Sequence, residues 1–288
     1  MNILDTILIF VKFITLSMVL LSAGGAIFYN IYYFELIKSQ QFIRKALFNA
    51  SIYALILSIL YQFLDAARFS GSIDGIIDFE LQKMILLSHL GVAKLLLILG
   101  LLAIISSHKI GSKSSIILAT IGVSLVAFSF TYTGHTSENL YRLILAPVLI
   151  LHLLVVLFWF GSLFPLYFII KMETNQTAGQ IVSDYSRKAT LLVPMIFIAG
   201  IILSVILMGG INFLNHTYGQ ILLLKIVVFS ILMLIAAINK FLLGPELEMG
   251  RANAARDLQR AIIFEFILIS FIVGATTALT GFFSPTMS

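Results

Sequence analysis

The chain has 288 residues, of which 60% are hydrophobic and only 11% are charged, and its formal net charge is +5. Soluble domains contain about 45–50% apolar and about 25% charged residues, so this composition excludes a soluble globular protein, which could not bury so much apolar surface. Cysteine is absent, which excludes disulfides and thiolate metal sites and leaves histidine and methionine as the soft-metal ligands.

Long apolar runs predict an all-α polytopic membrane protein with eight transmembrane helices. Each run exceeds the about 20 residues that a helix needs to cross about 30 Å of hydrocarbon, and none shows the alternation of a barrel strand. The first run is too long for a signal peptide, and its acidic Asp5 precedes Lys12. In chain order the predicted helices span residues 6–34, 44–68, 84–107, 114–135, 142–170, 187–212, 218–243 and 258–283.

The basic residues predict the orientation of these helices. Twelve of the 18 Lys and Arg residues follow the first, third, fifth and seventh helices. Because basic loops remain in the cytoplasm, we expect both termini on the periplasmic or extracellular side of the cell (inner) membrane. This charge distribution indicates a bilayer rather than a nucleic acid as the partner. The twelve residues are Lys38, Arg44, Lys45, Lys109, Lys113, Lys171, Arg187, Lys188, Lys240, Arg251, Arg256 and Arg260.

Similar short motifs recur in the same order in two halves of the chain. Because four helices per half is an even number, the halves, residues 1–135 and 136–288, would be parallel repeats within one membrane domain, and transporters often bind substrate where such repeats meet. Basic caps and Thr-Gly ends are also ordinary features of membrane helices. The matching motifs are Arg44-Lys45-Ala46 with Arg187-Lys188-Ala189, Lys94 and Lys109 with Lys225 and Lys240, Thr133-Gly134 with Thr280-Gly281, and Gly24 or Gly25 with Gly161.

Four of the five histidines fall on the predicted outer side. His135 ends the fourth helix, His216 precedes the seventh, and His89 lies near the outer end of the third. His152 lies ten residues into the fifth helix, about 15 Å deep at about 1.5 Å per residue, where a histidine is costly unless it faces the bundle interior. The fifth, His108, ends the third helix on the cytoplasmic side.

Methionines extend this pattern and indicate copper as the metal. Met84 begins the predicted third helix and Met208 lies near the outer end of the sixth. Imidazole and thioether ligands suit copper, and staggered weak sites suit a path that an ion must also leave. His135 and His152 are then too far apart in depth to form one chelate. Each of these residues also has a structural reading, as a helix–helix hydrogen bond or as core packing.

Other charged groups predict buried networks rather than catalysis. We expect structural roles for Lys94 and Lys225, which lie inside helices, and buried partners for Glu265 and for Asp65 with Arg68. Trp159 follows His152 by two turns and either lines its pocket or only packs. No nucleotide loop, carboxylate pair or nucleophile–base motif occurs in the sequence, so we predict no enzyme.

A series of short motifs follows in order between residues 130 and 285. These motifs are Thr133-Gly134-His135, His152-Leu153-Leu154, Phe158-Trp159-Phe160-Gly161, Tyr185-Ser186-Arg187-Lys188, Tyr218-Gly219-Gln220, Asn239-Lys240 and Leu258-Gln259-Arg260 with Glu265. Through them the chain resembles the CopD family of bacterial copper-resistance membrane proteins. The resemblance implies an eight-helix inner-membrane protein that moves copper from periplasm to cytoplasm, with His135 and His152 at the family's histidine positions. The chain lacks long Met- or His-rich outer loops, so we expect a separate periplasmic copper-binding protein to deliver the ion.

Two alternatives remain open at the level of sequence. Histidines on facing helices at similar depth can ligate haem, so a membrane redox protein with haem b between His89 and His152 is one. An assembly factor that delivers copper to a membrane oxidase without net transport is the other.

Overall fold

The computed structural model describes residues 3–110, 113–134, 139–208 and 217–282. Within these ranges eight helices are long and apolar enough to span a membrane, and no strand occurs. This confirms the predicted fold class, whereas the internal repeat and the sides on which the termini lie remain predictions. The eight helices are α1 (Ile3–Ile31), α2 (Gln40–Ser70), α4 (His89–Ser107), α5 (Lys113–Ser129), α6 (Arg142–Met172), α7 (Asn175–Met208), α8 (Thr217–Ile238) and α10 (Ala254–Phe282).

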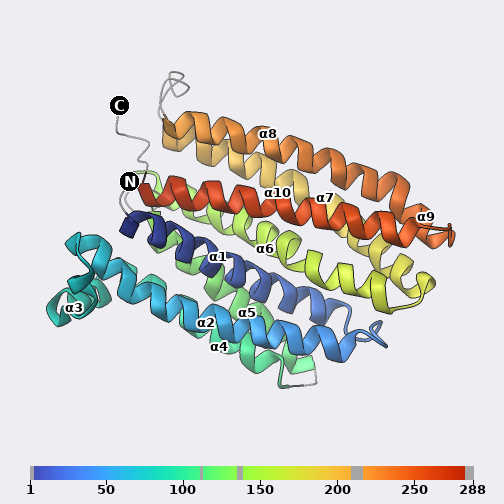
Figure 1. Cartoon of the computed structure of the whole chain (residues 1–288), viewed down its shortest axis with the longest axis horizontal. Helices are drawn as coiled ribbons and strands as arrows, with labels where there is room; N and C mark the ends of the chain where they lie inside the picture. The colour runs from blue at the N-terminus through green and yellow to red at the C-terminus, as the bar shows by residue number, and fades with distance from the viewer. Residues whose placement is uncertain (1–2, 111–112, 135–138, 209–216, 283–288) are drawn as a thin grey trace.

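In the described part of the chain, five short helical segments cap or connect the spanning helices. Two 3₁₀ turns, η1 (Ile73–Ile76) and η2 (Phe130–Tyr132), and the helix α3 (Phe79–Leu87) lie at the end of the bundle where α1 begins and α10 ends (Figure 1). At the opposite end, the π-helical η5 (Asn239–Leu243) leads from α8 into α9 (Gly244–Glu248). We call these the terminal end and the basic end, because the loops that carry Lys38, Lys109, Lys171 and Arg251 lie at the latter.

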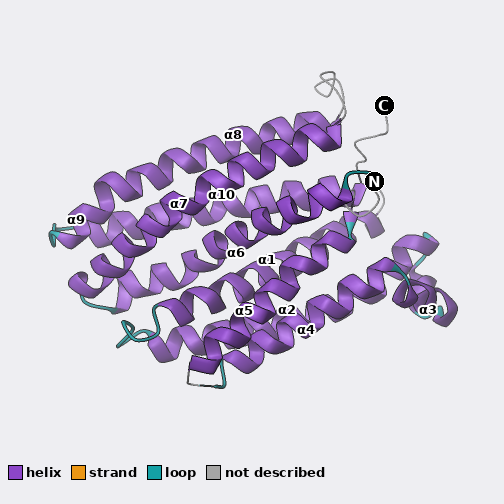
Figure 2. Cartoon of the chain, turned by 180° about the vertical axis from the view of Figure 1, so that it is seen from behind, coloured by secondary structure: helices purple, strands orange, loops and turns teal. Residues whose placement is uncertain are grey.

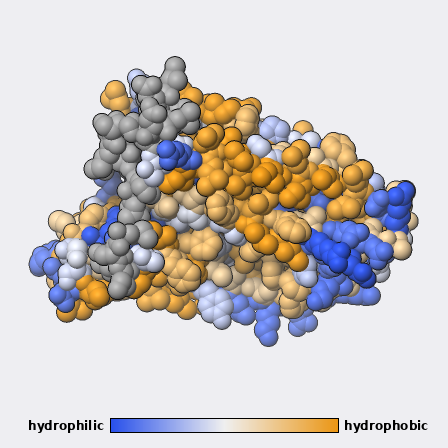
Figure 3. Space-filling view, turned by 45° about the horizontal axis from the view of Figure 1, so that its top comes forward, coloured by the Kyte–Doolittle hydropathy of each residue, from blue (hydrophilic) through white to orange (hydrophobic). Residues whose placement is uncertain are grey.

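The surface follows the pattern expected of a membrane protein. Large apolar side chains are exposed along the helices, for example Leu234, Phe241 and Phe264. Figure 3 shows an apolar band over the bundle, with hydrophilic residues gathered at the basic end. Lipid tails would cover such a band, because apolar patches of this extent are not found on soluble monomers.

The predicted third helix, residues 84–107, is wrong at its start because Ser88 interrupts it. The Ser88 backbone is extended, with ψ of 178°. Its N–H donates to Ile85 O and ends α3, while its Oγ accepts from Leu90 N and begins α4. A serine that satisfies free backbone groups in this way favours a helix boundary, which hydropathy does not detect. Met84 therefore belongs to the short α3 and not to a spanning helix.

The centre of the molecule is a close crossing of α1 and α6. A Cβ added at Gly24 would lie 1.6 Å from Leu157 O, and one added at Gly161 would lie 2.4 Å from Gly25 N. The two backbones are thus in direct contact, and Phe28, Leu157 and Phe160 are buried around them. Small residues allow this approach between membrane helices, where van der Waals packing replaces the hydrophobic driving force. The crossing joins the predicted halves at the glycines that the repeat would make equivalent.

The two halves share part of their helix contacts. In the first half α1 packs on α2 and α5, and α4 packs on α5; in the second, α6 packs on α7 and α10, and α8 packs on α10 (Figure 2). In the first half α2 also packs on α4, whereas the described residues of α7 and α8 make no comparable contact. Duplication of the sequence remains a prediction.

A single carboxylate holds two loops together at the basic end. Glu173 directly follows α6, in the loop before α7. Its Oε1 accepts hydrogen bonds from the backbone N–H groups of Ile37, Lys38 and Ser39 at 2.8–3.0 Å and from Ser39 Oγ at 2.6 Å. Burial opposes ionisation here, but the four donors outweigh it and lower the pKa of Glu173. The α1–α2 loop is thereby fixed to the end of α6.

We expect Glu173→Gln to lower the thermal unfolding midpoint at neutral pH, because a hydrogen bond to a charged group contributes about 1.5–3 kcal/mol. The native pKa of Glu173 lies below its unfolded value of about 4.3, so its contribution is present above that pH and is lost as the pH falls further. The midpoints of wild type and variant, measured in detergent, should converge on acidification. Parallel pH profiles, or an equal loss in the exposed control Glu35→Gln, would contradict this role.

Candidate functional site

Three of the six predicted metal ligands have no described side chain. His135 and His216 lie outside the described residues, and Met208 ends α7 with its side chain outside the described part. Among the residues that the structure describes, no group of three or more His, Asp or Glu side chains is placed to hold a metal ion. The described part of the chain therefore offers single ligands rather than a closed chelate.

Met84 and His89 lie on either side of the break at Ser88, at the terminal end. The Met84 side chain is 62% exposed on α3, and His89 is an exposed residue at the first position of α4. Their exposure makes them accessible from the terminal end, but nothing in the described structure shows that they act together.

His152 lies between three helices of the second half. Its Nδ1 is 3.3 Å from the carbonyl oxygen of Ile196 on α7. Because a carbonyl can only accept a hydrogen bond, Nδ1 carries the proton in this contact and Nε2 retains a lone pair. Gly200 on α7 leaves its Cβ position 3.9 Å from His152 Cε1, and the ammonium of Lys225 on α8 acts electrostatically on the ring. His152 is thus oriented by a backbone group as metal-binding histidines usually are.

Two turns further along α6, Trp159 contacts a buried carboxylate. Its Nε1 donates to Oε2 of Glu265 on α10 at 3.3 Å, and Asn239 of η5 contacts Oε1 of the same carboxylate through its side-chain amide at 2.6 Å. Glu265 is 5% exposed and Trp159 is 6% exposed. We call Trp159, Asn239 and Glu265 the Glu265 cluster. The expectation of a buried partner for Glu265 is confirmed, and the polar edge of Trp159 serves this carboxylate.

Two adjoining cavities lie between the Glu265 cluster and the basic end. The inner one, of about 240 Å³, is lined by the cluster together with Tyr185, Met233 and Lys240. The outer one, of about 350 Å³, is lined by Arg187, Glu248 and several hydroxyl groups. Asn239 and Lys240 of the π-helical turn line both cavities, as do Val182, Ser186 and Thr190 of α7. Such turns are frequent at functional sites.

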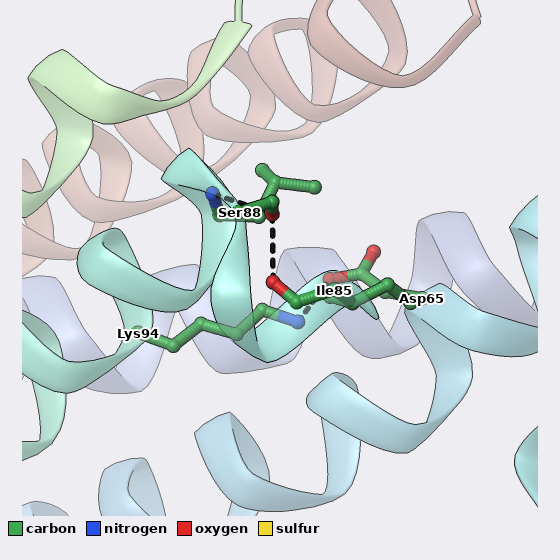
Figure 4. Close-up of polar contacts among 5 residues, drawn as sticks. Asp65, Ile85, Ser88 and Lys94 are labelled. Carbon is green, nitrogen blue, oxygen red and sulfur yellow. Dashed lines mark hydrogen bonds and ion pairs between the residues drawn. The ribbon is translucent and has the colours of Figure 1, made fainter. Parts of the chain in front are cut away.

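In the first half, a buried ion pair joins α2 and α4. Lys94 Nζ of α4 lies 2.6 Å from Asp65 Oδ2 of α2 (Figure 4), and the two side chains are 15% and 7% exposed. The ion pair agrees with the structural role expected for Lys94, whereas Asp65 was expected in a buried network with Arg68. The repeat offset that relates Arg44 to Arg187 also relates Asp65 to Met208, so the second half has no acidic residue at that position. Lys225, which corresponds to Lys94, makes no ion pair with the described residues.

His108 was predicted only to end a helix at the cytoplasmic side; in the structure it is buried at the basic end without a hydrogen-bond partner among the described residues. It follows α4 at the basic end, where burial and then the nearby Arg44 guanidinium lower its pKa to about 4. The ring is therefore neutral at physiological pH. The offset that relates Lys109 to Lys240 also relates His108 to Asn239, whose Oδ1 is likewise buried and unpartnered.

The fold and these sites define a multi-pass α-helical membrane protein with polar side chains buried between its helices. Residues 179–279 match the family model described as copper resistance protein D. The chain is also 25% identical over 263 residues to copper resistance protein D of Pseudomonas syringae pv. tomato, which covers 85% of this chain and 84% of that protein. Both matches confirm the resemblance to the CopD family. No solved structure matches the chain. The segment that the family model matches contains Asn239, Lys240 and Glu265 but not His152.

Proposed function

We propose that this protein moves copper across the cell (inner) membrane, from the periplasmic terminal end to the cytoplasmic basic end. The name of its relative, a copper resistance protein, supports copper as the cargo. The observation that carries the proposal is the half-buried imidazole of His152 on α6, which contacts Ile196 O on α7 through Nδ1 and retains a lone pair on Nε2. Imidazole nitrogen is a good ligand for copper, and an intramembrane histidine in this position is a functional candidate by default.

The proposed path lies within the second half rather than between the halves. At the α1–α6 crossing the backbones of Gly24 and Gly161 touch, so this contact leaves no room for an ion. In the first half, a Cβ at Gly100 would lie 2.7 Å from Gly122 O, so α4 and α5 are also in close contact. His152, the Glu265 cluster and both cavities all lie among α6, α7, α8 with η5, and α10.

In this proposal His135, His216 and Met208 capture copper at the terminal end, with Met84 and His89 as exposed auxiliary ligands. His152 then passes the ion inward, and a periplasmic copper-binding protein supplies it. The charge on Lys225 weakens cation binding at His152 by like-charge repulsion. Weak binding suits a transport path, because an ion that is held tightly leaves slowly.

We expect His152→Ala to reduce copper uptake by about tenfold or more, because even the loss of a ligand's supporting partner lowers metal affinity by about 10–100-fold. Uptake would be measured with isotopic copper in vesicles that contain only the purified protein. The matched control is His89→Ala, which removes an exposed histidine and should have a smaller effect. Unchanged uptake in His152→Ala at a normal protein level would refute the role of His152.

The same preparation separates the alternatives. Copper retained after desalting, together with flux in vesicles, supports transport. Copper retained without flux supports a copper-delivery assembly factor. Iron near one per chain with a Soret band would instead support the haem b protein and make His152 an axial ligand.

A further inference from the structure

Glu265 is a carboxylate buried in the bundle with no cation paired to it among the described residues. It lies 11 residues into α10 from the basic end, which is about 16 Å at about 1.5 Å per residue. Its side chain contacts the neutral groups of Trp159 and Asn239. The ion pairs of the described chain do not include it. A charge in this position is costly, and the cost is removed when the carboxylate binds a proton or a cation.

The charged and titratable groups around Glu265 leave it without a counter-ion. On α7, Tyr185 accepts a hydrogen bond from Ser162. On η5, Lys240 lines the same cavity but donates to Thr190 Oγ1 at 2.7 Å. Apart from Glu265 itself, the residues of α6 and α10 that line this cavity carry no charged side chain. Arg187 and Glu248 line only the outer cavity.

The contact with Asn239, at 2.6 Å from Oε1 of Glu265, can serve either protonation state of the carboxyl group. The amide oxygen and nitrogen of an asparagine are interchangeable by a half-turn of the side chain. With the amide turned, Oδ1, which is otherwise buried without a partner, accepts the O–H of Glu265. When Glu265 is ionised, Nδ2 donates instead.

We propose that Glu265 is a proton-binding site, reached from the basic end through the two cavities, at which a monovalent cation replaces the proton. Either ligand neutralises the carboxylate, so the two exclude each other. Arrival of a cation releases one proton towards the basic end, and its departure allows one to return. Asn239 adapts to both states by turning its amide. The role in cation passage rests on the proposed copper transport, whereas the protonation of Glu265 does not.

Infrared difference spectroscopy on the whole protein in detergent, recorded during a pH titration, tests the protonation without copper. Wild type should show the carbonyl band of a buried carboxylic acid that titrates, and Glu265→Gln should lose this band. The control Glu80→Gln, which removes an exposed carboxylate on α3, should keep it. If Glu265→Gln does not fold, Glu265→Asp should retain the band with a shifted frequency or midpoint. A band unchanged in a folded Glu265 variant, or no buried-acid band in wild type, would overturn the proposal.

Addition of Cu(I) to the unbuffered protein with a pH indicator tests the exchange. Wild type should lose the acid band and release about one proton per bound copper, and Glu265→Gln should bind copper without that release. Copper binding that leaves the wild-type band intact would overturn the exchange. Absence of any copper binding in wild type would instead count against the proposed function, while the titration would still decide the protonation of Glu265.

Discussion

Gly24→Ala is expected to cause the largest loss of stability of any glycine-to-alanine change in the described chain. The new Cβ would lie 1.6 Å from Leu157 O and 3.0 Å from Gly161 Cα, so α1 and α6 must separate. Overpacking in a core costs about 1–3 kcal/mol and sometimes more, and at this crossing the obstructing atoms belong to backbone, which cannot change rotamer. The measurement is the thermal unfolding midpoint and the yield of monodisperse protein in detergent.

Gly274→Ala is the matched control for this change. Gly274 is also helical, but its added Cβ would meet only the Phe13 ring at 3.8 Å or more, which is an ordinary contact. Because glycine weakens a helix interior by about 0.5–1 kcal/mol relative to alanine, this variant should be as stable as wild type or more stable. Equal midpoints for the two variants would show that the α1–α6 crossing does not limit stability.

Asp65→Leu is expected to produce the second large loss, because it leaves the Lys94 ammonium buried without its partner. Breaking a buried ion pair by removing one member costs about 3–5 kcal/mol, whereas replacing both members by apolar residues is often neutral. The double variant Asp65→Leu/Lys94→Met should therefore regain most of the lost stability. The measurement is a double-mutant cycle on unfolding midpoints in detergent.

An exposed pair provides the comparison for that cycle. Arg251 and Glu246 lie 2.6 Å apart with 60% and 33% of their side chains exposed, and exposed pairs contribute about 0–1 kcal/mol. Arg251→Leu should therefore change the midpoint little. If Asp65→Leu were as mild as Arg251→Leu, the Lys94 side chain would be reaching water by another route.

The eight spanning helices could be predicted from the sequence because a bilayer imposes one length requirement on every run. The interruption of one predicted helix and the extension of another could not be predicted. At Ser88 the interruption depends on two hydrogen bonds of a single serine. The start of α7 lies twelve residues before the predicted residue 187, in a polar segment where Ala178 and Ile181 are nevertheless buried. Average hydropathy over a window detects neither feature.

The candidate site was predictable in part. Depth alone indicated that His152 faces protein, and its contact with Ile196 O agrees with this. The partner of Glu265 was not predictable, because the π-helical turn at Asn239 changes which side chains of that segment face α10. The proposed roles of His135 and His216 remain predictions, since both lie outside the described residues. Helix packing, rather than residue type, decides which buried polar groups meet.

The crossing of Gly24 with Gly161 also has a consequence for biosynthesis. Gly161 is synthesised roughly 140 residues after Gly24, which takes about 7–30 s at about 5–20 residues per second. During that interval α1 is in the membrane without the helix that covers its glycine face, and the first four helices cannot complete their packing. The later half of the chain therefore supplies the surface against which α1 completes its packing.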